Sequence, residues 1–185
     1  HWLSQRRLLY SVSSADFRVS FMSHAVSIPH TLTIAGSDPS GGAGLQGDLK
    51  TLSALGTYAT NVITAVIAQN TCGVREVHPV AAESIRVQLD HLLDDVRIDA
   101  VKIGMVASRE VAETLREALE ARRPRWIVLD PVMVAKSGDI LVDRAGIRAV
   151  RDILVPLADV ITPNLPEAAV LLDAETPRTT EAMAT

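Results

Sequence analysis

The stretch AGSDPSGGAGLQGDLK, residues 35–50, decides the fold expected for this 185-residue chain. It follows a short apolar run at 32–35 and leads into a helical pattern, so it predicts a strand, a glycine-rich turn and a helix. Glycine lets the backbone approach a ligand closely, and the start of a helix offers free N–H groups. We therefore expect a small-molecule site at the end of the first strand of an α/β domain.

Short apolar runs alternate with helical patterns along the rest of the chain. Between the expected strands, apolar residues recur at helical spacing, Ser108 is placed to cap one helix, and Pro166 opens a last short helix. This alternation predicts an α/β fold in which right-handed crossovers build a mostly parallel sheet with helices on both faces. Strands are expected at residues 32–35, 62–68, 100–103, 126–129 and 160–162.

Composition and charge narrow the class of protein. Apolar residues make up 48% of the chain and aromatic residues only 3%, which suits buried parallel strands packed against helices. The net charge of −4 argues against a nucleic-acid partner, and no apolar run is long enough to cross a membrane. The single cysteine, Cys72, excludes an internal disulfide and fits a reducing compartment, so we predict a cytoplasmic protein.

The first 21 residues differ from the rest, because they begin with a histidine and are rich in arginine and serine. A transit peptide has this composition, but an internal start at Met22 is the simpler interpretation. We therefore expect residues 1–21 to be a disordered upstream segment, and residues 22–185 to belong to one domain.

Two familiar nucleotide-binding motifs do not fit the glycine-rich turn. Residues 42–47 have the letters of the dinucleotide fingerprint, but the second strand ends in Gln69 and Asn70, with no acidic residue until Glu76. A Walker A loop is excluded because Gly47 is followed by Asp48 rather than lysine. The turn is therefore a glycine-rich site of another kind.

Polar or glycine-rich groups follow each expected strand, where the carboxyl ends of parallel strands share one edge of the sheet. Solvent-exposed loops, which are polar in general, readily explain one or two of these positions, but they explain less well why every turn carries such a group. Asp48 could accept a hydrogen bond from a ligand amine, or could instead favour the helix dipole. Gln69 suits the edge of an amino-substituted heterocycle, or could tie down a loop. Met105 could pack on a flat ring, or simply fill the core.

A second group of polar residues suits phosphates and a magnesium ion. Asp130 follows the fourth strand, and Asn164 and Glu167 lie one strand further on. For Glu167 the alternative is a structural role in the first turn of a helix, and Lys136 either reaches an anion or is a solvated loop charge. Cys72 is expected to be inert, and the five scattered histidines predict no His/Cys metal site.

Several segments occur together in the order found in one known family. They are residues 33–44, 68–71, 102–105, 130–133, 136–139 and 161–168. Through them the chain, from about Thr31 to Asp173, resembles the hydroxymethylpyrimidine/phosphomethylpyrimidine kinases of thiamine biosynthesis, which are ribokinase-like proteins. Such kinases transfer the γ-phosphoryl group of ATP to the hydroxymethyl group of an aminopyrimidine, and then a second one to the monophosphate.

The resemblance implies roles for eight residues. It implies that Gln69 hydrogen-bonds the aminopyrimidine. The remaining pyrimidine-pocket residues that it implies are Asp48, Ala43, Met105 and Val132. It further implies that Asp130, Asn164 and Glu167 face ATP and Mg²⁺, with Asp130 and Glu167 holding the metal through water. It also implies a homodimer, and the charge and the apolar runs already argue against a nucleic-acid or membrane partner.

One departure concerns the end of the chain. The family carries a Lys-Gly-Gly segment and a Gly-Thr-Gly-Cys-type loop, whose cysteine is the base, beyond the point that corresponds to Thr185. We therefore expect the N-terminal part of a ribokinase-like domain, with a complete pyrimidine pocket, no assignable catalytic base and little phosphoryl transfer by itself. The alternatives are a non-catalytic aminopyrimidine-binding module and a pyridoxine-type kinase.

Overall fold

The structure is a computed structural model that describes residues 27–133 and 142–176. The expectations for residues 1–21 and for Lys136 lie outside these ranges.

One sheet of six strands organises the described residues, in the order β3-β2-β1-β4-β5-β6. The pairs β1–β2, β1–β4, β4–β5 and β5–β6 are parallel, and only β2–β3 is antiparallel. This confirms the predicted mostly parallel sheet. The strands are β1 (His30–Gly36), β2 (Tyr58–Asn70), β3 (Gly73–Pro79), β4 (Ala100–Ile103), β5 (Trp126–Leu129) and β6 (Val160–Ile161).

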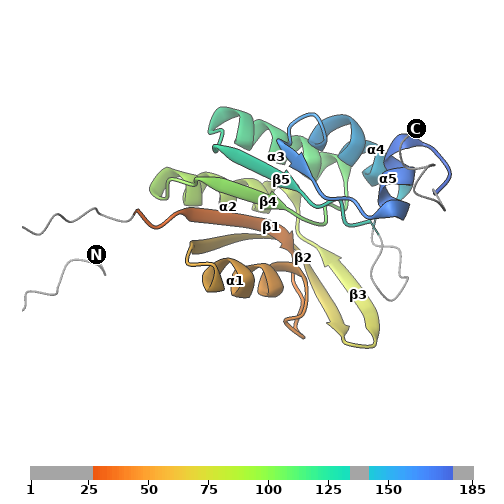
Figure 1. The fold of residues 1–185 in the computed structure, drawn as a ribbon, viewed down its shortest axis with the longest axis horizontal. Coiled ribbons are helices and arrows are strands. Elements are labelled where there is room, and N and C mark those ends of the chain that lie inside the picture. Colours follow the sequence, from red (N-terminus) through yellow and green to blue (C-terminus); the bar gives the residue numbers. More distant parts are fainter. Residues whose placement is uncertain (1–26, 134–141, 177–185) are drawn as a thin grey trace, which may run out of the picture.

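Helices cover both faces of this sheet, as predicted. Figure 1 shows α1 on one side of the sheet and α2, α3 and α4 on the other, and α1 packs against β1 and β2. Ser108 accepts a hydrogen bond from the Val111 N–H, which confirms the predicted cap. The helices are α1 (Gly44–Ala54), α2 (Ala82–Asp95), α3 (Arg109–Ala121), α4 (Arg144–Ala149), the π-helical η1 (Val150–Leu154) and α5 (Leu165–Leu172).

The two faces of β1 carry different side chains because neighbouring residues of a strand point in opposite directions. Leu32 and Ile34 are fully buried in the main core, together with apolar residues of α2 and α3. Thr33, between them, donates a hydrogen bond from Oγ1 to Asp48 of α1. The α1 side of the sheet therefore offers polar partners to the residues near the ends of the strands.

The antiparallel strand β3 was not predicted, and β2 is longer than the expected 62–68. The segment Gly73–Pro79 is mostly exposed and has no clear apolar alternation, so its sequence resembles a loop. It becomes a strand because the chain turns back after Asn70, so that Gly73–Pro79 pairs antiparallel with the second half of β2. In this turn Asn70 Oδ1 accepts the Cys72 N–H. This hairpin projects from the body of the molecule in Figure 1.

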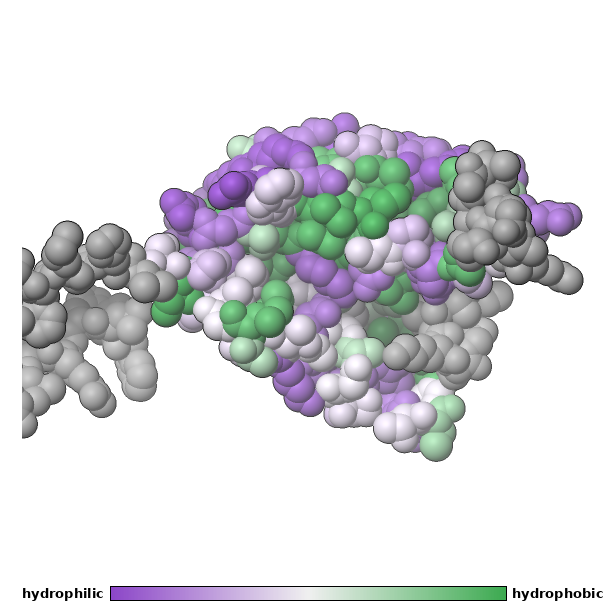
Figure 2. Space-filling model, in the orientation of Figure 1, coloured by the Kyte–Doolittle hydropathy of each residue, from purple (hydrophilic) through white to green (hydrophobic). Residues whose placement is uncertain are grey.

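The other edge of the described sheet is β6, and its two residues are half-exposed apolar side chains, Val160 and Ile161. In the space-filling view, a hydrophobic patch lies in the region where Figure 1 places β6 (Figure 2). Among the described residues, no helix combines the length and the apolar character that a membrane crossing needs.

Candidate functional site

A cavity of about 610 Å³ opens at the carboxyl edge of the sheet. The turns after β1, β4 and β5, the β2–β3 hairpin and the start of α5 all contribute to its walls. All eight residues singled out from the sequence line it, although they are spread over more than 120 positions of the chain: Ala43, Asp48, Gln69, Met105, Asp130, Val132, Asn164 and Glu167. Their roles toward a ligand stay predictions. Their shared location agrees with the expectation that residues near the carboxyl ends of parallel strands lie at one edge of the sheet.

The glycine-rich turn after β1 is organised around the buried carboxylate of Asp38. Its Oδ1 accepts from the N–H and the hydroxyl of Ser40, at 2.9 and 2.7 Å. Its Oδ2 accepts from the N–H groups of Gly42 and Ala43, at 3.1 and 2.8 Å. A side-chain carboxylate thus occupies the position in which a glycine-rich turn can hold a phosphate. The expectation that these N–H groups are free for a ligand is wrong for Gly42 and Ala43.

These hydrogen bonds also decide the charge state of Asp38. Burial alone raises the pKa of the carboxyl, but hydrogen bonds from Ser40, from the Ala43 N–H and from the Gln69 amide outweigh it and hold the pKa below its usual range. The carboxylate is therefore ionised at neutral pH. The same carboxylate therefore holds the turn together and influences the surroundings of Gln69, which lines the same cavity.

Gly44 is the residue that lets this turn close on the strand. Its φ of +52° lies in the left-handed region, and a Cβ built on it would lie 2.5 Å from the backbone oxygen of Gly36. No side chain fits in that space. The first turn of α1 is thereby held directly against the end of β1.

Asp48 projects from α1 toward the sheet rather than toward open solvent. Its Oδ2 accepts from Thr33 Oγ1 at 2.6 Å and from Lys102 Nζ at 3.0 Å, and its Oδ1 lies 3.2 Å from the same ammonium. The residue lies beyond the first turn of α1, so the structure does not support the helix-dipole alternative. A carboxylate has about four acceptor positions, which leaves room for one more hydrogen bond.

An apolar wall completes this end of the cavity. Met105 is buried and packs with Ala65, Ile67 and Val142, and Val132 packs against the same cluster. Gly36 keeps the wall flat, because a Cβ there would lie 2.8 Å from Ile67 Cδ1. A flat ring between this wall and the polar groups of Gln69 and Asp48 would meet one apolar face and one hydrogen-bonding edge.

Oxygen-bearing side chains gather at the other end of the cavity. Asp130 Oδ2 lies 3.3 Å from Lys102 Nζ. Asn164 and Glu167 form a capping box at the start of α5, in which each side chain accepts the other's backbone N–H at 2.9 Å. Glu167 thus has the structural role in the first helical turn that was the alternative to a ligand role. It also lines the cavity, so the two roles are compatible.

Two functional residues were not found from the sequence. Lys102 was overlooked as a site residue because it lies inside β4 rather than after its end, although its side chain reaches the cavity. Asp38 belongs to the glycine-rich turn that the sequence predicted, but its role in holding that turn was not predicted, because the hydrogen bonds that it accepts depend on how the turn closes.

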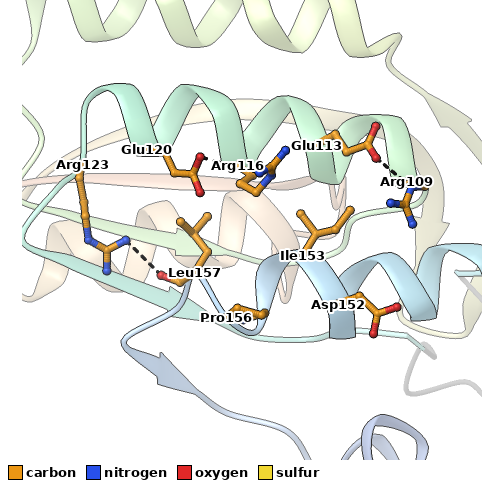
Figure 3. Close-up of a pocket in the computed structure, with 9 residues that line it drawn as sticks. All are labelled: Arg109, Glu113, Arg116, Glu120, Arg123, Asp152, Ile153, Pro156 and Leu157. Carbon is orange, nitrogen blue, oxygen red and sulfur yellow. Dashed lines mark hydrogen bonds and ion pairs between the residues drawn. The ribbon is translucent and has the colours of Figure 1, made fainter.

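A second hollow, of about 670 Å³, lies between α3 and η1, away from the carboxyl edge. Its charged residues come from α3, from the segment just after α3 (Arg123) and from η1. Figure 3 shows Arg109 bonded to Glu113 and Arg123 bonded to the Leu157 carbonyl. Two ion pairs, Arg109–Glu113 and Arg116–Glu120, join residues of its lining, and Arg123 and Asp152 pair with residues outside it. None of the residues predicted for function lines this hollow.

A mostly parallel sheet with a cavity across its carboxyl edge, lined by polar and apolar groups, is typical of α/β proteins that bind small molecules. The sequence matches the phosphomethylpyrimidine kinase family over residues 38–185, and the chain belongs to this family. It is 53% identical over 154 residues to the hydroxymethylpyrimidine/phosphomethylpyrimidine kinase of Salmonella typhimurium, covering 83% of this chain and 58% of that protein. The chain therefore spans somewhat more than half the length of this curated relative.

Solved structures show the same fold. The phosphomethylpyrimidine kinase from Clostridium difficile 630 superposes with a TM-score of 0.77 at 45% identity, covering 84% of this chain and 67% of that one. The pyridoxal kinase of Staphylococcus aureus, solved with AMP-PCP and pyridoxal, has a TM-score of 0.75 at 34% identity, covering 85% of this chain and 56% of that one. The fold is ribokinase-like, as the sequence predicted.

Proposed function

We propose that this chain forms the pyrimidine-binding part of a kinase that phosphorylates 4-amino-5-hydroxymethyl-2-methylpyrimidine and then its monophosphate. One observation carries the proposal: all residues predicted for the aminopyrimidine and for the phosphates line one cavity. The greater identity to phosphomethylpyrimidine kinases than to pyridoxal kinases supports this choice of ring.

In this proposal the ring lies against Met105 and Val132, and its amino edge faces Gln69 and Asp48. The hydroxymethyl group then points toward Asp130, Asn164 and Glu167. Its oxygen forms a bond to the γ-phosphorus of ATP and gives up its proton, the bond between the γ-phosphorus and the β–γ bridging oxygen breaks, and ADP leaves. The contribution of the described residues is to position the two reactants and to exclude water, because phosphoryl transfer depends mainly on positioning and charge neutralisation.

The oxygens at the Asp130 end suit a magnesium ion. Within residues 27–133 and 142–176, no group of three or more His, Cys, Asp or Glu side chains could hold a metal. Mg²⁺ commonly binds one or two carboxylates, with phosphate oxygens and water as its remaining ligands. Asp130 and Glu167 are therefore proposed to hold it through water, and ATP would supply the phosphate ligands.

Two calorimetric titrations test the proposal. The first adds 4-amino-5-hydroxymethyl-2-methylpyrimidine to the chain without nucleotide, and we expect saturable binding. The second adds pyridoxal, which the structural likeness to pyridoxal kinases makes the strongest competitor, and we expect much weaker binding. Absence of heat with the pyrimidine would refute the proposed site, and tighter binding of pyridoxal would favour the pyridoxine-type alternative.

A coupled assay for ADP release addresses the remaining points. Turnover of the pyrimidine with ATP by this chain would show that the proposed pocket also catalyses, whereas binding without turnover would match the expectation of an incomplete nucleotide site. Light scattering tests the homodimer implied by the family resemblance.

A further inference from the structure

Lys102 lies at the junction between the two ends of the cavity. It is in register with Thr33 on β1 and with Val128 on β5, in the middle of the parallel sheet. Thr33 and Lys102 both contact Asp48, so both side chains lie on the face of the sheet that α1 covers. The ammonium is thus fixed by strand register, not by a loop.

The Lys102 ammonium contacts one carboxylate from each end of the cavity, Asp48 and Asp130. Nζ lies 3.0 and 3.2 Å from the two oxygens of Asp48, and 3.3 Å from Asp130 Oδ2. The side chains of Lys102, Asp48 and Asp130 are 25, 22 and 34% exposed. In every other ion pair of the described residues, at least one side chain is 38% exposed or more. Less water screens this contact, so it is stronger than an ordinary surface pair.

Two further features show that the cavity is built around this charge. Among the described lining residues Lys102 is the only basic side chain, whereas four are acidic: Asp38, Asp48, Asp130 and Glu167. Gly104 leaves room for it, because a Cβ there would lie 3.3 Å from Lys102 Nζ and 3.0 Å from the Ala35 Cβ.

We infer that Lys102 is a positioning residue that sets the Asp48 carboxylate toward the substrate and ties it to Asp130 at the phosphate end. The inference rests on the proposed function. Without the ammonium, Asp48 keeps only its bond from Thr33 and turns more freely, and Asp48 and Asp130 are no longer bridged by a positive charge. A pyrimidine that hydrogen-bonds Asp48 would then lose a preorganised partner.

The test is a double-mutant cycle, read by calorimetry with 4-amino-5-hydroxymethyl-2-methylpyrimidine on the full 185-residue chain. Lys102→Met should weaken binding by roughly tenfold, the size expected for a lost charge-assisted contact. Asp48→Asn should weaken it similarly, and the double variant should bind about as well as Asp48→Asn alone, because Lys102 acts through Asp48. Arg97→Met is the matched control, since it removes a cation paired with Asp99 near the other end of β4 and should leave the affinity unchanged.

Each other outcome has a definite meaning. Wild-type affinity in Lys102→Met, or losses that simply add in the double variant, overturns the inference even where the melting temperature falls. No binding by the wild-type chain refutes the proposed function, and this inference with it. If Lys102→Met does not fold, Lys102→Arg replaces it, because it keeps the charge but moves the donors. Unchanged affinity in that variant also overturns the inference.

Discussion

The two hollows of this molecule are nearly equal in volume, at about 670 Å³ between α3 and η1 and about 610 Å³ at the carboxyl edge of the sheet. Their polar groups differ in origin. In the hollow between α3 and η1, the pairs Arg109–Glu113 and Arg116–Glu120 are four residues apart on one helix and exposed to solvent. At the carboxyl edge, the polar groups come from separate strands and turns, and several are buried or half-buried.

This difference shows that size alone does not identify a site. Ion pairs along one exposed helix form wherever charges recur at that spacing, and each contributes little. Side chains that converge from distant segments need the whole sheet to place them, and a few convergent polar groups in a partly apolar cavity are typical of a ligand site. The side chains of the carboxyl-edge cavity converge from distant segments in this way. The substitutions below test how strongly the two hollows differ.

The largest effect is expected from Gly44→Ala. The new Cβ would meet the Gly36 backbone oxygen at 2.5 Å in a left-handed conformation. We expect a loss of about 3 kcal/mol in the free energy of unfolding, measured by urea denaturation, together with loss of pyrimidine binding. Gly56→Ala is the control: its φ is also positive, at +81°, but nothing lies within 4 Å of the new Cβ. It should cost about 1 kcal/mol, and equal losses in the two variants would show that the contact with Gly36 is unimportant.

Asp38→Asn comes next. The amide NH2 would face N–H donors of Ser40, Gly42 or Ala43, so one or more of these bonds is lost in a buried place. We expect the free energy of unfolding to fall by about 2 kcal/mol at pH 7. Asp95→Asn, at an exposed position at the end of α2, should change nothing measurable.

The same variant predicts a pH dependence of known sign. Hydrogen bonding holds the pKa of Asp38 in the folded chain below its ordinary value of 3.8, so the unfolded chain takes up the proton first as the pH falls. The stabilisation is therefore complete above the unfolded pKa and is lost as the pH falls through the folded one. The gap between wild type and Asp38→Asn should stay constant near neutral pH and narrow in acid; a gap that widens in acid would contradict this account.

A smaller and more specific effect is expected from Gln69→Leu. It removes the hydrogen-bonding amide from the cavity while keeping a similar volume. Pyrimidine affinity should fall by about tenfold, measured by calorimetry. Gln88→Leu is the matched control, because that amide bonds the backbone of Ile63 outside the cavity. It should lower the melting temperature and leave the affinity of the folded protein intact.

The smallest effect is expected in the hollow between α3 and η1. Arg116→Ala removes a half-exposed side chain whose ion pair with Glu120 spans 3.9 Å. Both the stability and the pyrimidine affinity should stay the same, within about 0.5 kcal/mol. A marked loss of affinity would mean that this hollow takes part in binding after all, and that the contrast between the two hollows is false.

Asp130 was predictable because it directly follows β5, and parallel strands end at one edge. Gln69 was expected after a strand ending at residue 68, but it lies within β2, which continues to Asn70, and it still reaches the cavity. Lys102 was not predicted, because its Cα lies inside a strand and only its long side chain reaches the edge. The strand β3 escaped prediction for a related reason, since its residues are mostly exposed and become a strand only by pairing with β2.

The sequence by itself determined the alternation of strands and helices, the glycine-rich turn and the family, since local spacing and short motifs carry this information. Only the tertiary structure decided which charges meet. In the folded chain the Gly42 and Ala43 N–H groups donate hydrogen bonds to Asp38, and Lys102 lies between Asp48 and Asp130. The physical reason is that a hydrogen bond or an ion pair depends on distances of about 3 Å, and such distances between remote residues are set by sheet register and helix packing.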